Sequence, residues 1–150
     1  MSERFTAARG RKVVSRASAE EIGSVSHLVI DPERRVVAEL VVGRGRGAQI
    51  VAFGDLSGFG ADAVMVTGED ALREPHGDRD HAAVKGRLDA ICRLALSDLG
   101  NELGHVSDIV FDPQTGVIET VLIGDDEHPG EALLGAGGYA VVLRVLPASA

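Results

Sequence analysis

Two stretches of the chain share the same order of apolar and polar positions. Ile22–Gly43 aligns without a gap to Leu103–Gly124 at an offset of 81 residues, and eight of the 22 aligned positions are identical. Seven further positions are apolar in both stretches, for example Leu28 and Ile109. This pattern indicates an internal duplication, and two copies at so long a spacing are not typical of a solenoid or a propeller.

Each copy predicts a β-hairpin. In the first copy, Val25–Ile30 and Val36–Val42 are rich in Val, Ile and Leu and are separated by turn residues. Both turns begin with Asp-Pro, in which proline sets φ near about −65° and the Asp side chain can accept a backbone N–H. We therefore predict a structural role in the turns for Asp31, Pro32, Asp112, Pro113 and Gly116. The first copy has Arg35 where the second has Gly116, so its turn is expected to be strained.

Shorter apolar stretches flank both hairpins. They are Arg11–Ser15, Ala48–Phe53 and Ala63–Val66 in the first copy, and Cys92–Leu96, Glu131–Gly135 and Tyr139–Val145 in the second. About five short strands per copy, with glycine-rich corners, suit a small barrel that closes its own edges. A copy of about 60 residues is marginally stable alone. The copies are therefore expected to pack together as a pseudo-twofold pair or to form a homodimer.

The prediction is thus an all-β protein with two small β-barrels in tandem and a short helical linker. The first barrel is assigned to residues 10–70, the linker to 71–91 and the second barrel to 92–147. Within the linker, Glu74–Asp80 is expected to be a loop and Ala82–Ile91 a short helix weakened by Gly86.

Composition and charge restrict the class of protein. The chain has 150 residues, of which 45% are hydrophobic and 25% charged, as in globular domains. No apolar run approaches the roughly 20 residues that a bilayer requires, and the N-terminus has no apolar stretch of a secretory signal. Cys92 is the single cysteine, so a reducing, cytoplasmic location is expected. Its apolar surroundings in the sequence predict that Cys92 is buried.

The charge is unevenly distributed. The net charge is −8, yet residues 1–16 carry +4, which leaves −12 for the remainder. An acidic body argues against a broad nucleic-acid surface. The basic arm is expected to be a frayed terminus, or else a contact for RNA, for an acidic partner or for the protein's own acidic body. The "GRGRG" segment is expected to be a flexible hairpin loop, with an RNA contact as the alternative. The candidate contact residues are Arg4, Arg9, Arg11, Lys12, Arg44 and Arg46.

No motif in the sequence predicts catalysis or a bound cofactor. "GAGGYA" (Gly135–Ala140) has the spacing of a dinucleotide fingerprint, but an apolar strand follows it instead of a helix. His27 and His105 would need a nucleophile or activated water within reach. "HGDRDH" offers His76 and His81 as candidate metal ligands, with a solvated linker as the alternative. "DDEH" (Asp125–His128) is interpreted as the acidic tip of a hairpin.

The repeated pattern resembles the PRC-barrel family. Both "EIGSVSHLVIDPERRVVAELVV" and "ELGHVSDIVFDPQTGVIETVLI" match its paired strands around "DP", and "LSGFGADAVMV" and "LLGAGGYAVVLRV" match its closing strands. The resemblance extends over nearly all of residues 10–146. The family includes a cytoplasmic domain of a photosynthetic reaction-centre subunit and a domain of a ribosome-maturation factor. What the resemblance implies is docking onto other macromolecules and no catalysis.

The leading hypothesis is a non-enzymatic interaction module that docks protein partners. The alternative is an RNA- or ribosome-associated accessory factor that uses the basic arm. A third hypothesis is a small-ligand or metal-binding regulator that uses the linker histidines.

Overall fold

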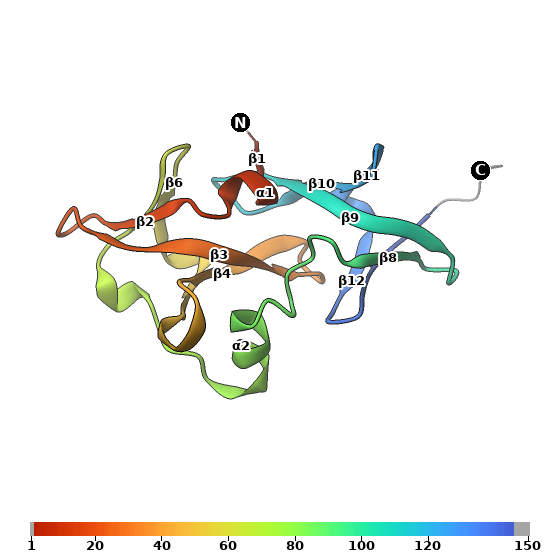
Figure 1. The fold of residues 1–150 in the computed structure, drawn as a ribbon. Coiled ribbons are helices and arrows are strands. Elements are labelled where there is room, and N and C mark those ends of the chain that lie inside the picture. The colour runs from red at the N-terminus through yellow and green to blue at the C-terminus, as the bar shows by residue number, and fades with distance from the viewer. Residues whose placement is uncertain (1, 146–150) are drawn as a thin grey trace.

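The computed structural model describes residues 2–145, which form two sheets of the same strand order (Figure 1). The sheet of the first repeat has six strands in the order β5-β4-β3-β2-β7-β6. Its strands are β2 (Lys12–Ser15), β3 (Glu21–Asp31), β4 (Val36–Val42), β5 (Gln49–Ala52), β6 (Leu56–Phe59) and β7 (Ala63–Val66).

The sheet of the second repeat has the corresponding order β11-β10-β9-β8-β13-β12, and one additional strand, β1 (Glu3–Arg4), pairs with β9. Its strands are β8 (Leu94–Ser97), β9 (Glu102–Phe111), β10 (Ile118–Ile123), β11 (Asp126–Pro129), β12 (Leu133–Ala136) and β13 (Ala140–Leu143). The predicted all-β fold with tandem barrel-like domains is confirmed.

In both repeats a parallel pair joins the first strand to the last. β2 pairs in parallel with β7, and β8 pairs in parallel with β13, whereas the other neighbours are antiparallel. Each repeat therefore begins and ends side by side, which curls its sheet toward a barrel. Register shifts at Val13/Val14 and at the equivalent Ala95/Leu96 bend the first hairpin in the same way in both copies.

The helices are short. They are α1 (Phe5–Ala8), α2 (Gly77–Val84) and the 3₁₀ turns η1 (Gly45–Gly47), η2 (Phe53–Asp55), η3 (Glu69–Ala71) and η4 (Gly130–Ala132). None of the helices within residues 2–145 is long and apolar enough to cross a membrane.

Each repeat contains six strands. The predicted correspondence between the strands that follow the two hairpins was wrong. Sheet order makes β5 equivalent to β11 and β6 to β12, so Ala48–Phe53 does not correspond to Glu131–Gly135. The loop after β4 is longer than the loop after β10, so the offset between equivalent residues falls below 81 beyond the hairpin. The polar segment Asp125–His128, interpreted above as a hairpin tip, lies largely within strand β11 at a sheet edge. Charged side chains at such an edge oppose pairing with the edge of another sheet.

The two hairpin turns meet on the pseudo-twofold axis. Val36 and its equivalent Val117 form an antiparallel bridge. The Val37 N–H donates to Gly116 O at 2.8 Å, and the equivalent Ile118 N–H donates to Arg35 O at 2.9 Å. The same contact is thus made twice, with the roles of the copies exchanged, which confirms the predicted pseudo-symmetry.

The turn residue that differs between the copies behaves as expected. Arg35 has φ of 58° and Gly116 has φ of 81°, so a residue with a Cβ occupies the left-handed region in the first copy. Arg35 Nε donates to Leu133 O at 2.8 Å in the second repeat, an interaction that offsets part of this strain. In both turns the Asp carboxylate accepts a backbone N–H, from Glu33 for Asp31 and from Gln114 for Asp112.

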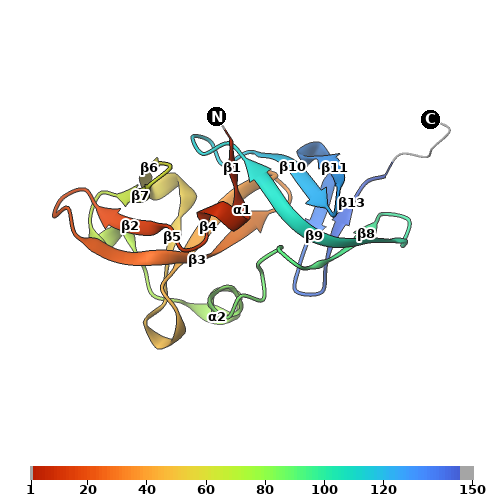
Figure 2. The same cartoon turned by 45° about the horizontal axis from the view of Figure 1, so that its top comes forward.

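The N-terminal segment belongs to the second repeat, which corrects the interpretation of a frayed arm. β1 and α1 lie along β9, beside β3 of the first repeat (Figure 2). Phe5 is fully buried with its ring edge-to-face on Phe111 at 5.5 Å, and Thr6 donates to Asp108 through its N–H and its hydroxyl. The apolar contact of Phe5 and the hydrogen bonds to the buried carboxylate of Asp108 thus order this terminus. Its basic charge alone gave no reason to expect an ordered segment.

The segment before the second repeat lies in turn on the first. Leu88 packs on Val29, Val41 and Ala48, and Asp89 is hydrogen-bonded to His27, the residue equivalent to Asp108. Each repeat therefore packs its leading segment on the other repeat. Buried residues of both repeats, including Leu28, Leu40, Ile109, Phe111 and Leu133, form one apolar cluster, which confirms that the copies pack together.

The linker helix begins earlier than expected. It covers Gly77–Val84, so the predicted loop at Glu74–Asp80 and the predicted helix at Ala82–Ile91 were both misplaced. Asp80 is the reason: its carboxylate accepts the His76 N–H at 2.8 Å and the Arg73 guanidinium at 2.5 Å. These contacts hold the pKa of Asp80 below its ordinary value, the Arg73 hydrogen bond being the largest cause. Gly86, with φ of 79°, follows the end of the helix.

Cys92 is exposed, not buried, and has φ of 68°. The equivalent residue is Gly10, with φ of 82°; the N–H of each donates to an equivalent carbonyl, Val25 for Gly10 and Val106 for Cys92. A left-handed residue with a Cβ costs about 1–2 kcal/mol, and glycine loses about 0.5–1 kcal/mol more in backbone entropy on folding.

We expect Cys92→Gly to stabilise the protein by about 0.5 kcal/mol in urea unfolding, because the first effect is the larger of the two. A loss of stability would contradict the equivalence with Gly10.

Candidate functional site

A buried carboxylate lies where the two repeats and the linker meet. The side chain of Asp89 is 4% exposed, and its Oδ2 lies 2.9 Å from His27 Nδ1 and 2.5 Å from an Arg9 guanidinium nitrogen. Its Oδ1 accepts the Ile91 N–H at 3.0 Å. The N-terminal segment, β3 and the linker thus each contribute one partner, so Asp89 ties three parts of the chain together.

The surroundings of Asp89 favour its charged form. Burial alone would raise the pKa of this carboxyl, but hydrogen bonds from His27, the Ile91 N–H and Arg9, together with the charge of Arg9, outweigh burial. The pKa of Asp89 therefore lies below its ordinary value, and the carboxylate is ionised at neutral pH. Asp89 serves as a buried anion that holds Arg9 and His27 in place.

The His27–Asp89 pair does not have the surroundings of a catalytic dyad. A general base needs a nucleophile or water within hydrogen-bond reach, and no hydroxyl or thiol of residues 2–145 is hydrogen-bonded to His27 or His105. The His27 ring instead faces backbone, because a Cβ at Gly86 would lie 2.9 Å from its Nε2. This arrangement suits structural pairing between the repeats.

The six candidate contact cations have different environments. Arg9 binds Asp89, and Arg11 is 10% exposed, donating to Glu3 and to Gly60 O while lying over the Phe59 ring. Arg4 lies 3.7 Å from Asp108 and is 57% exposed, and Lys12 pairs with Glu21 at the surface. Arg44 and Arg46 are exposed on the β4–β5 loop. Arg9 and Arg11 are therefore structural, and the remaining four are open to solvent.

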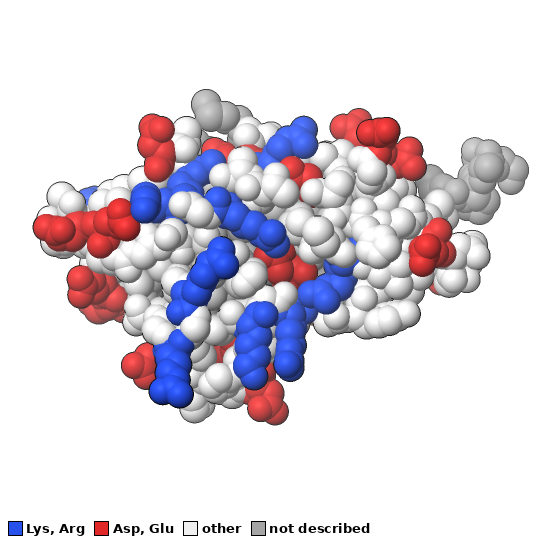
Figure 3. All heavy atoms as spheres, viewed as in Figure 1, with Lys and Arg blue, Asp and Glu red and all other residues white. Residues whose placement is uncertain are grey.

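Further cations of the linker, which were not among the predicted contact residues, extend this face. Lys85 and Arg87 are exposed on either side of Gly86. Arg93 fixes the backbone of this linker segment, because its guanidinium donates to the carbonyls of Arg87, Asp89 and Gly138. Figure 3 shows Lys and Arg gathered over the middle of one face, across α1, β3 and α2, while most Asp and Glu on this face lie toward its edges. The spacing "KGR" after the helix was the available signal for these residues.

A groove opens on this basic face between the η1 loop and α2. Its volume is about 550 Å³, and its six lining residues, none of them acidic, are Gly45, Arg46, Pro75, His81, Val84 and Lys85. His81 Nδ1 is hydrogen-bonded to Gly77 O at 2.7 Å, which fixes the ring along the helix. A neighbouring pocket of about 370 Å³ shares Arg46 and Pro75 and includes Glu74. The groove thus combines apolar walls with cations, and one carboxylate lies at one end.

The linker histidines do not converge on a metal site. His76 uses its N–H for the Asp80 carboxylate, while His81 lies on the helix facing the groove. Within the part of the chain that the structure describes, no three His, Cys, Asp or Glu side chains come together as metal ligands.

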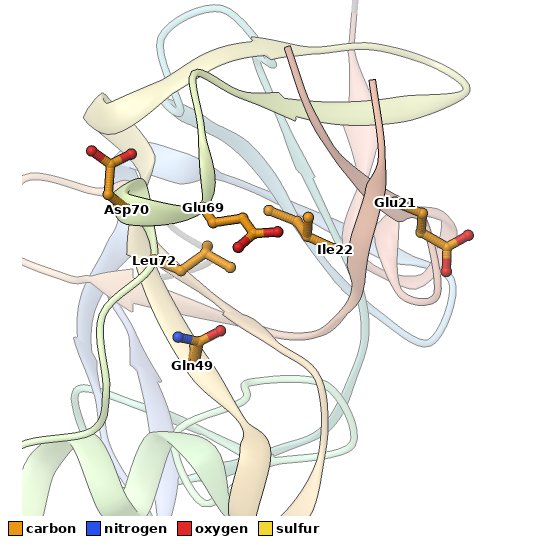
Figure 4. A pocket seen from close by; sticks show the side chains of 6 residues that line it. All are labelled: Glu21, Ile22, Gln49, Glu69, Asp70 and Leu72. Carbon is orange, nitrogen blue, oxygen red and sulfur yellow. The ribbon is translucent and has the colours of Figure 1, made fainter. Parts of the chain in front are cut away.

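A further pocket, of about 460 Å³, lies on the first repeat and is acidic. Its lining residues are Glu21, Ile22, Gln49, Glu69, Asp70 and Leu72. Figure 4 shows Glu69 beside Ile22 and Leu72, whereas Glu21 and Asp70 point away on opposite sides. Carboxylates that diverge in this way do not form a cation site, so this pocket carries no chemistry comparable to the basic face.

The comparisons with known proteins agree with the fold of the second repeat. Residues 94–145 match the family model described as the PRC-barrel domain. No curated protein matches the chain. The matched segment begins at β8 and ends after β13, so it spans the six strands β8 to β13 of the second sheet but not β1.

Proposed function

Since residues 94–145 form a PRC-barrel domain, we propose that the protein is a non-enzymatic module that docks a protein partner through the basic face. The first repeat has the same strand order, and the two repeats share one apolar core. We place the docking in a reducing compartment, the cytoplasm, because the single cysteine is an exposed thiol.

The observation that carries the proposal is the group of exposed cations on a chain of net charge −8. No ion pair among residues 2–145 involves Arg44, Arg46, Lys85 or Arg87, so these side chains are available to a partner. Exposed positive charges on one face attract an acidic partner surface toward that face and fix the orientation of the partner.

A compact acidic protein surface fits this face better than RNA does. Carboxylates toward the edges of the face repel a polyanion that extends beyond its centre (Figure 3). Recognition of single-stranded RNA also relies on exposed aromatic rings that stack on bases. The four Phe rings here, Phe5, Phe53, Phe59 and Phe111, pack on one another, and Tyr139, 77% exposed, lies in the β12–β13 turn.

The test is capture of partners from a lysate of the native host by purified protein, with and without RNase. The triple variant Arg46→Glu, Lys85→Glu and Arg87→Glu is expected to lose a captured protein that RNase treatment leaves in place. Because close charge pairs at interfaces contribute about 1.5 kcal/mol or more each, reversing three charges should reduce capture by at least tenfold.

The matched control reverses three exposed arginines on other elements: Arg16→Glu, Arg34→Glu and Arg144→Glu. This control should retain the partner, since it changes the net charge equally but leaves the basic face intact. Equal loss in both variants, or a partner that disappears with RNase, would contradict the proposal, and the second result would favour the RNA-associated alternative.

A further inference from the structure

We propose that the groove between the η1 loop and α2 binds a short acidic segment of the partner that also carries an apolar side chain. This inference rests on the proposed function and specifies the chemistry that the basic face recognises. The occupant is a peptide segment in extended conformation, with carboxylates toward Lys85 and an apolar side chain against Val84 and Pro75.

The lining residues determine this chemistry. A groove of about 550 Å³ is large enough for two or three side chains. Val84 and Pro75 offer apolar contact, while Arg46 from the loop and Lys85 from the end of the helix provide charges on separate elements. An apolar ligand would leave these charges unused, and a free inorganic anion would leave the apolar walls uncovered.

The position of Glu74 sets a direction along the groove. Glu74 is exposed in the adjoining pocket, which shares Arg46 and Pro75 with the groove. Its negative charge repels ligand carboxylates from that end, so they are expected near Lys85 and His81. Removal of this charge should therefore strengthen binding, an effect that a folding defect does not produce.

The packing beneath the groove favours a preformed site. α2 is anchored by Ala83, which packs with Val29, Val41 and Ala48, and by the Asp80–Arg73 pair at its start. Ala48 directly follows η1, so the same apolar contacts hold both sides of the groove. Binding therefore requires little ordering of the protein.

The experiment is a titration of the ¹⁵N-labelled full chain with a synthetic six-residue peptide of alternating Glu and Leu, followed by ¹H–¹⁵N NMR. Amide shifts are expected at residues 45–48 and 81–86. A peptide with Lys in place of Glu, and one with Ser in place of Leu, should each bind at least tenfold more weakly. Equal binding of the Lys peptide, or shifts confined to other residues, would overturn the inference.

Variants make the assignment specific. Arg46→Ala combined with Lys85→Ala should weaken the Glu–Leu peptide about tenfold, whereas Glu74→Gln should strengthen it about twofold, as expected for exposed charge contacts. The control pair Arg34→Ala and Arg144→Ala should leave the affinity unchanged. Unaltered affinity in all variants would overturn the inference.

Two outcomes separate this inference from the proposed function. If the charge-reversed triple variant loses its protein partner but the peptides never shift residues 45–48 or 81–86, the docking function stands and the groove assignment fails. If these same resonances shift when the unliganded protein is diluted, a second copy occupies the groove, and the inference of an acidic partner segment fails.

Discussion

Gly130→Ala is expected to unfold the second repeat or to destabilise it by about 4 kcal/mol or more. A Cβ at this position would overlap the Ile118 carbonyl oxygen and lie 2.7 Å from the Ile118 carbonyl carbon, both of them backbone atoms of β10. No rotamer change relieves a clash with backbone, so β10 and η4 must separate. For a chain of this size such a loss lowers the melting temperature by roughly 10 °C or more, which circular dichroism measures directly.

The control for this substitution is Gly137→Ala. Gly137 is exposed, does not have positive φ, and a Cβ added to it would have no neighbouring atom within 4 Å. Its replacement should be neutral or stabilise by a few tenths of a kcal/mol. Equal melting temperatures of the two variants would show that β10 yields at Gly130, against the close approach of β10 and η4.

Asp89→Asn should destabilise the protein by about 2 kcal/mol. The change keeps the volume of the side chain but removes the charge that binds Arg9 and His27, and hydrogen bonds to a charged group contribute about 1.5–3 kcal/mol. The partners are partly exposed, at 35% for Arg9 and 27% for His27, so solvent recovers part of the loss and the lower half of that range applies. Urea unfolding at neutral pH gives the difference.

The lowered pKa of Asp89 also predicts how the stability difference between the wild type and Asp89→Asn depends on pH. Because the folded protein holds the pKa of Asp89 below its ordinary value, the ionised carboxylate stabilises the fold at every pH above about 4. That contribution is lost as the pH falls through the lower, folded pKa. The stability difference between the wild type and Asp89→Asn should thus shrink as the pH falls below about 4.

Asp62→Asn is the control for both measurements, since Asp62 is exposed. Surface substitutions of this kind change stability by less than about 0.5 kcal/mol. A difference for Asp89→Asn that grows as the pH falls below about 4 would mean that the carboxyl is held in its neutral form, contrary to the contacts observed.

The elements that could be predicted from the sequence are those with local patterns. The two hairpins followed from runs of Val, Ile and Leu around Asp-Pro, and Arg35 identified one strained turn because its equivalent is Gly116. The polar strand β11 was missed because an edge strand needs few apolar side chains. The pairing of β5 with its counterpart was missed because a longer loop shifts the offset between the copies.

The contacts at the candidate site depend on residues that are distant in the sequence. Asp89 binds Arg9 and His27, which are 80 and 62 positions away, and no local pattern encodes such a meeting. The same holds for Arg46 and Lys85, which share the groove through the packing of Ala48 and Ala83. Lys85 and Arg87 are close together in the sequence, but they were not among the predicted contact residues.

The exchange of leading segments between the repeats also sets the order in which the molecule can be completed. Glu3 pairs with Phe111, and Thr6 binds Asp108, which is 102 residues farther along the chain. On a ribosome the first segment therefore emerges long before its docking strand has been synthesised, and Phe5 stays without its place in the core. Because closing so long a loop is slow compared with hairpin formation, the docking of residues 3–8 is the expected last step of folding. A nascent chain that stops before β9 thus exposes an aromatic side chain that chaperones and proteases can detect.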